Sequence, residues 1–352
     1  MALNLAIIGS GIIGLACAQR LALEGCRVTT FDGNRESREA SWAAAGMLAP
    51  HNEAQEPHAF WQLCYDSLKL WPDFIKKLGG EGQETDFSQE ADFHQEGCWI
   101  PVFDDAERRQ LTEKALRFRE VGVDFEWVLA KDLAQRAPEL NPQILGAYFV
   151  EGGHVDPRCV CKILRNRCRE LGVELQYENS VAQIQKNTLV DSHGQARRFD
   201  HIVLAAGAWT PHLAQLTGVE LLGEPVKGQM LRFSPHPQHR RFKGFVHCEH
   251  AYAVQRSDGS TVIGSTMEYC GFDHQNNPDS IAKLLAGARK LLPHLQQCEL
   301  QETWTGLRPK LGDGSPYFKR VNEHLTVATG HFRNGILLTP ITAELVKKMV
   351  LG

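Results

Sequence analysis

The sequence lacks several features that mark other classes of protein. No uninterrupted apolar run is long enough to cross a membrane, and no basic region precedes the first apolar run. Neither sign of charge is in large excess, because 38 basic residues stand against 42 acidic ones and the net charge is -4. No basic stripe, internal repeat or low-complexity tract is present. We therefore expect a cytoplasmic protein that binds neither membrane nor nucleic acid.

Disulfide frameworks and metal motifs are also missing. The ten cysteines have no framework-like spacing, so reduced thiols are expected. Cys159, Cys161 and Cys168 come closest to a metal-ligand pattern, but the segment that holds them has the apolar periodicity of an amphipathic helix. We expect no metal site.

The strongest motif that is present lies within residues 4–32. A short apolar run is followed by a G-x-G-x-x-G turn, made by Gly9, Gly11 and Gly14, then by helical apolar spacing and a second strand that ends at Asp32. In this order the glycines allow a tight turn, close approach of a pyrophosphate and close helix packing, while the helix N-terminus favours an anion. Asp32 is placed to bind ribose hydroxyls and disfavours a 2′-phosphate. The motif predicts a dinucleotide site.

Three later segments are further candidates for nucleotide contact. The small-residue run at 40–50 indicates either close packing or a flat ligand against the backbone. Val181 begins a strand that would meet an adenine, and Gly207 follows a buried strand, where a nucleotide lies in such folds. These positions suggest that the nucleotide domain resumes after an insertion.

The chain of 352 residues is long enough for two domains. Strand and helix patterns predict an α/β, Rossmann-like nucleotide domain and a second, mostly antiparallel β domain for the substrate. The predicted nucleotide domain is discontinuous and comprises residues 1–86, 147–222 and 303–352. The predicted substrate domain comprises residues 87–146 and 223–302.

A flavin fits the pattern better than a nicotinamide. An NAD dehydrogenase supplies an acid or base near its substrate, and no Ser/His/Asp or Lys/Tyr arrangement stands out here. A C-terminal strand, glycine and helix suggest a second contact with a long cofactor, and FAD carries its own redox chemistry. The predicted start of the final helix, residues 333–337, would stabilise negative charge on a reduced flavin.

Arg308 is the sharpest candidate for substrate binding. It lies in the loop-like sequence W-x-G-L-R-P, between residues that restrict the backbone, and an arginine so placed can grip a carboxylate with two hydrogen bonds. A surface salt bridge is the alternative. Tyr252 is either a core residue or a hydrogen-bond donor to the same carboxylate, and both readings stay open.

Taken together, the motifs resemble the FAD-dependent amino acid oxidases of the D-amino-acid-oxidase superfamily, and within it the glycine oxidases of thiamine biosynthesis. The resemblance covers nearly the whole chain. It rests on GSGIIGLACA, SWAAAGMLAP, GHVDP and LAAGAWT, and most specifically on TWTGLRPKLGDGSPY with ATGHFRNGILLTP. Sarcosine oxidases share the first motif but differ at the C-terminal end.

The resemblance implies a set of site residues and a type of flavin attachment. Arg308 would hold the substrate carboxylate, Arg333 would lie beside the substrate, and Tyr252 would help to close the pocket. No cysteine follows Cys298, so we expect non-covalent FAD. Trp42 is a departure, since it is bulky within a small-residue run. The implied FAD contacts are Ile12, Ile13, Asp32, Gly33, Ala40, Ser41, Ala45, Gly46, Met47, Val181, His331, Phe332, Arg333, Asn334, Gly335, Ile336 and Leu337.

The implied reaction is oxidative deamination of glycine, sarcosine or small D-amino acids. A hydride would pass from Cα to flavin N5, O₂ would be reduced to H₂O₂, and the imine would either hydrolyse to glyoxylate and ammonia or supply the thiazole of thiamine. A homotetramer is the implied assembly. The alternatives are an amine dehydrogenase with another electron acceptor, a tRNA-modifying oxidoreductase, which the net charge disfavours, and a non-catalytic flavin-binding module.

Overall fold

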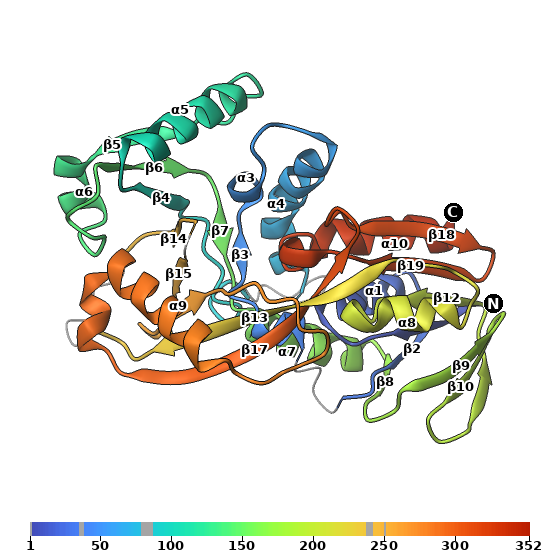
Figure 1. Ribbon diagram of the computed structural model, residues 1–352. Helices are drawn as coiled ribbons and strands as arrows, with labels where there is room; N and C mark the ends of the chain where they lie inside the picture. Colours follow the sequence, from blue (N-terminus) through green and yellow to red (C-terminus); the bar gives the residue numbers. More distant parts are fainter. Residues whose placement is uncertain (1, 35–38, 79–86, 237–241, 250) are drawn as a thin grey trace.

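Two large sheets, placed side by side, organise the molecule. The computed structural model describes residues 2–34, 39–78, 87–236, 242–249 and 251–352. One sheet lies toward the chain termini, and the other lies toward helices α5 (Asp105–Arg119), α6 (Ala130–Arg136) and α9 (Pro278–Leu291) (Figure 1). In the part of the chain that the structure describes, no helix combines the length and apolarity needed to cross a bilayer.

The sheet near the termini is mainly parallel, with only its edge pair β18–β19 antiparallel. Strands β1, β12 and β19 are buried at almost every residue, as parallel strands covered on both faces must be. Helix α1 (Ile12–Leu23) contacts both α7 (Pro157–Glu170) and α10 (Thr339–Leu351). The predicted nucleotide-binding α/β fold class is confirmed. The strand order is β18 (Tyr317–Asn322), β19 (Leu325–Thr329), β12 (His201–Leu204), β1 (Asn4–Ile8), β2 (Arg27–Phe31) and β8 (Glu174–Gln176).

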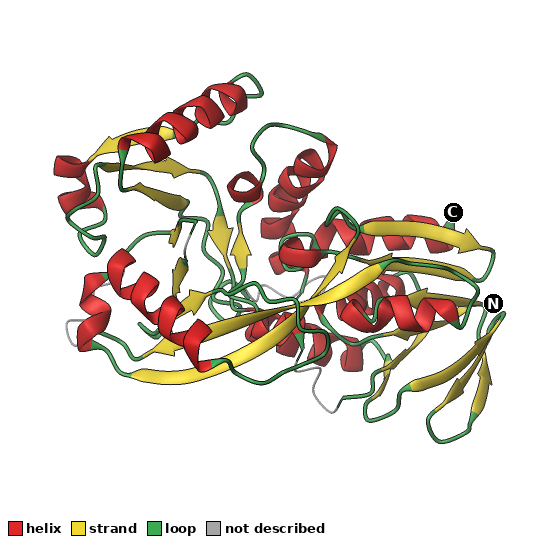
Figure 2. Ribbon diagram, viewed as in Figure 1, coloured by secondary structure: helices red, strands yellow, loops and turns green. Residues whose placement is uncertain are grey.

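The second sheet is antiparallel apart from the β14–β4 pair, as the sequence predicts. Its two longest strands, β13 and β17, run together through the middle of the molecule (Figure 2). Its strand order is β17 (Leu300–Leu311), β13 (Gly223–Phe233), β16 (Thr261–Gly264), β15 (Tyr252–Gln255), β14 (Phe245–His247), β4 (Cys98–Val102), β6 (Gly146–Val150) and β5 (Glu126–Leu129).

The predicted domain boundaries differ in detail from the sheet boundaries. The boundary between 302 and 303 falls inside β17, which pairs with β13 along its whole length and so belongs to the second sheet. The boundary between 146 and 147 falls inside β6. A strand pattern does not reveal which sheet a strand joins, so these ends were not predictable. The boundary after residue 86 lies outside the described residues, and the two-domain division stays a prediction.

The remaining elements lie outside the two large sheets, and β9, β10 and β11 form a small sheet of their own. Asp104 caps α5 by accepting hydrogen bonds from the backbone N–H groups of Ala106 and Glu107. These elements are α2 (Ala40–Ala43), β3 (Met47–Leu48), α3 (Pro50–Glu53), α4 (Ala59–Lys77), β7 (Gly153–His154), β9 (Val181–Gln185), β10 (Thr188–Asp191), β11 (Ala196–Arg198), α8 (Thr210–Gln215) and the 3₁₀ turns at Gly207–Trp209, Pro293–Gln297 and Phe332–Asn334.

Candidate active site

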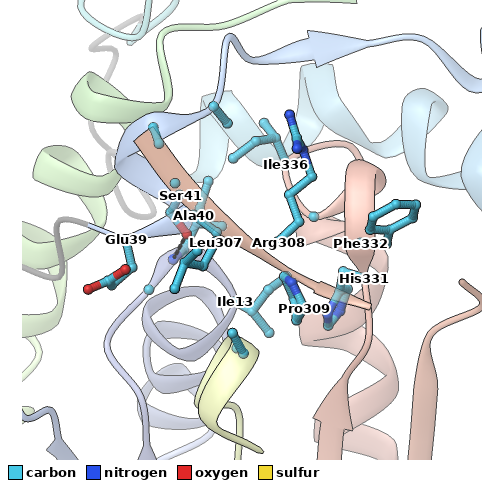
Figure 3. Close-up of a pocket in the computed structure, with 18 of the residues that line it drawn as sticks. Ile13, Glu39, Ala40, Ser41, Leu307, Arg308, Pro309, His331, Phe332 and Ile336 are labelled. Carbon is cyan, nitrogen blue, oxygen red and sulfur yellow. Dashed lines mark hydrogen bonds between the residues drawn. The ribbon is translucent and has the colours of Figure 1, made fainter. Parts of the chain in front are cut away.

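A cavity of about 640 Å³ brings together residues from both sheets, a size typical of a ligand site. Residues 39–41 lie on one side of β17, and His331 and Phe332 lie on the other (Figure 3). Gly14 and Leu337 lie outside the lining. The predicted residues that line the cavity are Gly9, Gly11, Ile12, Ile13, Asp32, Gly33, Ala40, Ser41, Ala45, Gly46, Met47, Val181, Gly207, Tyr252, Arg308, His331, Phe332, Arg333, Asn334, Gly335 and Ile336.

The glycine turn brings backbone, without side chains, to the cavity. Gly9 has φ +105°, and a Cβ there would lie 2.4 Å from the carbonyl oxygen of Ala205. Gly14 packs against this turn, since its Cβ would lie 1.8 Å from the Gly9 carbonyl oxygen. Gly11 caps α1 without a side chain, and the Ile12 N–H donates to Ser41 Oγ at 3.0 Å. The start of α1 therefore meets the cavity as an anion site would.

Two acidic side chains line the nucleotide end of the cavity. Asp32 accepts hydrogen bonds from the backbone N–H groups of Ser10 (2.7 Å) and Asn34 (2.9 Å). Glu39, which the sequence reasoning missed, accepts from Asn34 Nδ2 at 3.1 Å. Its Oε2 is buried and has no hydrogen-bond partner among the described residues. Burial and the nearby charge of Asp32 raise the pKa of Glu39 to about 7.

The chemistry of this end fits a dinucleotide. A helix start without side chains suits a pyrophosphate. Glu39 Oε2 lies 4.0 Å from His274 Nε2 and accepts no hydrogen bond from the described residues, so it can accept one from a polar ligand group. Asp32 and Glu39 would offer acceptors to ribose hydroxyls. The observed residues therefore fit the adenosine diphosphate part of FAD.

A buried arginine, Arg256, fixes the backbone of the segment around Gly46 by hydrogen bonds. Arg256 donates to the carbonyl oxygens of Ala45 and Val155, both at 2.7 Å. Gly46 has φ +84°, and a Cβ there would lie 2.0 Å from the Val155 carbonyl oxygen. This packing presents the Ala45–Gly46 backbone to the cavity with the small residues that the sequence shows.

The C-terminal segment corrects one prediction. The final helix α10 begins at Thr339, not within 333–337, and residues 332–334 form a 3₁₀ turn. Local turn bonds replace the helix there, including Asn334 N–H to the His331 carbonyl at 2.8 Å. The Leu337 carbonyl accepts from Ser67 Oγ (2.7 Å) and Trp71 Nε1 (2.9 Å), so Leu337 anchors the segment away from the cavity. Negative charge on a reduced flavin would therefore meet the 3₁₀ turn at residues 332–334 and not the N-terminus of α10.

Arg308 lies within strand β17 and not in a loop, so the loop predicted from W-x-G-L-R-P is wrong: this stretch pairs with β13, and the Arg308 guanidinium lies over Gly228 of that strand. Its Nη2 donates to Ser265 Oγ at 2.6 Å, and its Nη1 donates to the Thr266 carbonyl at 3.3 Å. Burial lowers the pKa of Arg308 below its usual value, but a guanidinium stays charged in proteins. It forms no ion pair with a carboxylate within the described ranges. A cation in this position is suited to a ligand carboxylate.

The second arginine of the cavity carries its own counterion. Arg333 Nε lies 2.9 Å from Glu53 Oε1, on α3. Tyr252 is buried on β15, and its hydroxyl donates to Met230 Sδ at 3.4 Å. Of the two arginines, Arg308 is therefore the one available to an incoming carboxylate.

Trp42 and His247 differ in their relation to the cavity. Trp42 does not line the cavity, because it stacks on the Arg158 guanidinium, 3.7 Å from its ring centroid. His247 does line it, beside Tyr252, with ring centroids 6.3 Å apart. Burial, and then the charges of Arg333 and Lys114, lower the pKa of His247 to about 3, so the imidazole is neutral. The sequence did not indicate that His247 lines the cavity, because a single histidine within a strand pattern has no distinguishing motif.

Comparison with known proteins identifies the family. The FAD dependent oxidoreductase family, DAO, matches residues 4–349. Glycine oxidase of Bacillus licheniformis is 31% identical, over 98% of this chain and 92% of that protein. The bifunctional protein ThiO/ThiG of Trichormus variabilis is 34% identical, over 99% of this chain and 53% of that protein. The crystal structure of glycine oxidase from Geobacillus kaustophilus has a TM-score of 0.92 and 28% identity, over 99% of this chain and 95% of that one.

The family resemblance read from the motifs is thus confirmed, as is FAD as the cofactor. The match extends over both sheets and every segment that lines the cavity. The chain belongs to the FAD dependent oxidoreductase (DAO) family and is an FAD-dependent amino acid oxidase.

Proposed function

We propose that the protein catalyses oxidative deamination of glycine and other small amines, such as sarcosine and small D-amino acids, to the imine. With glycine, hydrolysis of the imine gives glyoxylate and ammonia. FAD, when bound, supplies the two-electron oxidation and delivers the electrons to O₂, which forms H₂O₂. The observation that carries the proposal is the Arg308 guanidinium, which lines a cavity of this family and has no carboxylate partner among the described residues.

The roles of the substrate residues follow from their partners. Arg308 binds the carboxylate through the N–H groups that Ser265 and Thr266 leave free. Tyr252 helps to close the pocket around the substrate. Arg333, whose charge is balanced by Glu53, lies beside the substrate. Catalysis by these residues rests on positioning and charge, since His247 is too weakly basic to take a proton from an ammonium group.

The cofactor residues divide by the part of FAD that each suits. Gly9, Gly11, Ile12 and Ile13 would hold the pyrophosphate, with Asp32, Gly33 and Glu39 at the ribose and Val181 at the adenine. We propose non-covalent binding. The segments that would surround the ring system are Ala40, Ser41, Ala45, Gly46, Met47, Gly207 and residues 331–336.

The visible spectrum of the purified holoenzyme tests the reaction. Anaerobic glycine should bleach the flavin band, and readmitted air should restore it with formation of H₂O₂. Bleaching that air does not reverse would support the dehydrogenase alternative, and a flavin that no small amine bleaches would support a non-catalytic module. A salt-dependent gel shift with tRNA would support the tRNA-modifying oxidoreductase.

Three finer points remain predictions. The homotetramer, the cytoplasmic location and the supply of an imine for the thiazole of thiamine are implied by family resemblance. Size-exclusion chromatography with light scattering tests the assembly, and growth of a deletion strain without thiamine tests the last point.

A further inference from the structure

Lys114 is a buried lysine to which the proposed reaction gives no role. It lies on α5 and is 3% exposed. Its Nζ donates to the Asn52 carbonyl at 3.1 Å, and it forms no ion pair with a carboxylate within the described part of the chain. Burying an ammonium group without a counterion is costly. A residue retained under that cost needs a structural or functional reason.

The carbonyl that Lys114 holds belongs to α3, a helix of four residues. So short a helix cannot hold its own conformation. Its last three residues, His51, Asn52 and Glu53, each contact another element. His51 Nδ1 accepts a hydrogen bond from Trp61 Nε1 at 3.1 Å, and Asn52 Nδ2 donates one to Cys98 Sγ at 3.4 Å. Trp61 of α4, Cys98 of β4 and Lys114 of α5 therefore hold α3 from one side.

The third residue of that series, Glu53, points the other way, into the cavity. Glu53 Oε1 pairs with Arg333 Nε at 2.9 Å, and Glu53 Oε2 accepts from Asn334 Nδ2 at 3.4 Å. Asn52 and Glu53 both line the cavity. A continuous chain of contacts thus runs from Lys114, through the Asn52 backbone, to the carboxylate that orients Arg333.

We propose that Lys114 is a positioning residue of the substrate site: by holding the Asn52 carbonyl it fixes α3, so that Glu53 keeps Arg333 beside the substrate. The inference rests on the proposed function. Lys114 does not touch the substrate, and its effect passes through Glu53.

The environment of Lys114 adds a pH signature. Burial lowers the pKa of Lys114 to about 8. The titratable groups that face it are His51 and Glu53 on α3, Cys98 on β4 and His247 on β14. Raising the pH through about 8 neutralises the donor and weakens its hydrogen bond to Asn52. The KM for glycine should therefore rise above that pH, and an arginine at position 114 should remove the rise.

The test compares K114M, K114R and the control K131M, whose lysine is exposed on α6. K114M should raise the KM for glycine at least about fivefold, with a smaller change in kcat, because misplacement of a positioning group costs affinity. K114R should restore most of the loss, and K131M should match the parent. Equal KM values for K114M and the parent would overturn the proposal.

A double-mutant cycle separates positioning from general destabilisation. If Lys114 acts through Glu53, K114M should change KM less than twofold in an E53Q background. An undiminished effect there would overturn the proposed route. If K114M does not fold, the test is the pH dependence of K114R: its KM for glycine should not rise at alkaline pH, and a rise like that of the parent would overturn the proposal.

Binding of acetate to the holoenzyme, followed by calorimetry, distinguishes the two proposals. If glycine does not reduce the parent enzyme, the proposed function fails. The K114M holoenzyme should even then bind acetate more weakly than the parent, and unchanged binding would count against Lys114 alone.

Discussion

Arg308 Nη2 donates to Ser265 Oγ at 2.6 Å, a contact that aims the guanidinium while leaving N–H groups for a ligand. R308A should therefore lower kcat/KM for glycine by a factor that corresponds to about 2–4 kcal/mol of lost transition-state stabilisation. Most of this loss should be a rise in KM. R308K should recover only part of this, because lysine keeps the charge and loses the planar fork. Steady-state oxygen consumption measures both variants. An unchanged kcat/KM in R308A would remove Arg308 from the site.

The backbone beneath Arg308 gives a second prediction. A Cβ at Gly228 would lie 2.1 Å from Arg308 Nη2, so G228A should displace the guanidinium. We expect a rise in KM of roughly tenfold, as for a misplaced binding group. FAD affinity should be unchanged, since the predicted nucleotide contacts lie elsewhere. A fluorescence titration of the apoprotein with FAD provides that control, and weakened FAD binding would point to general distortion instead.

The stacked pair Trp42 and Arg158 gives a stability prediction. Arg158 also forms a two-point contact with Glu302, with both N···O distances at 3.2 Å, and Trp304 Nε1 donates to the Ala43 carbonyl at 3.0 Å. This cluster joins α2 and α7 to β17. W42A should lower the free energy of unfolding by about 2 kcal/mol. Thermal denaturation tests this prediction. An unchanged unfolding midpoint in W42A would show that the cluster does not stabilise the fold.

The sequence predicted the parts of the site that local chemistry determines. The turn from Gly9 to Gly14 and the acid at Asp32 follow from a strand, turn and helix of neighbouring residues. Arg308 was recognised as a candidate from its restricted surroundings. Its availability was not predictable, because that depends on Glu53, which is distant in sequence and pairs with Arg333.

Glu39 and His247 were missed for a related reason. The pKa of His247 is lowered by burial near Arg333 and Lys114, which are distant in the sequence. Asp32 is close to Glu39 in the sequence, but the burial that raises the pKa of Glu39 depends on the tertiary fold. The start of α10 at Thr339 was misjudged because the apolar residues 336–338 continue the helical pattern without a cap. Long-range packing, not local propensity, decides such details.

Glu39 supplies the last prediction, a pH dependence of stability. Burial raises its pKa to about 7 in the folded protein, above the ordinary value of 4.5. Between these values the folded state binds more protons than the unfolded state, so this group makes the apoprotein less stable as pH rises toward 7. E39Q cannot ionise and should flatten this decline. Melting temperatures of the apoprotein at pH 5, 6 and 7 measure it, and equal slopes in both proteins would refute the assignment.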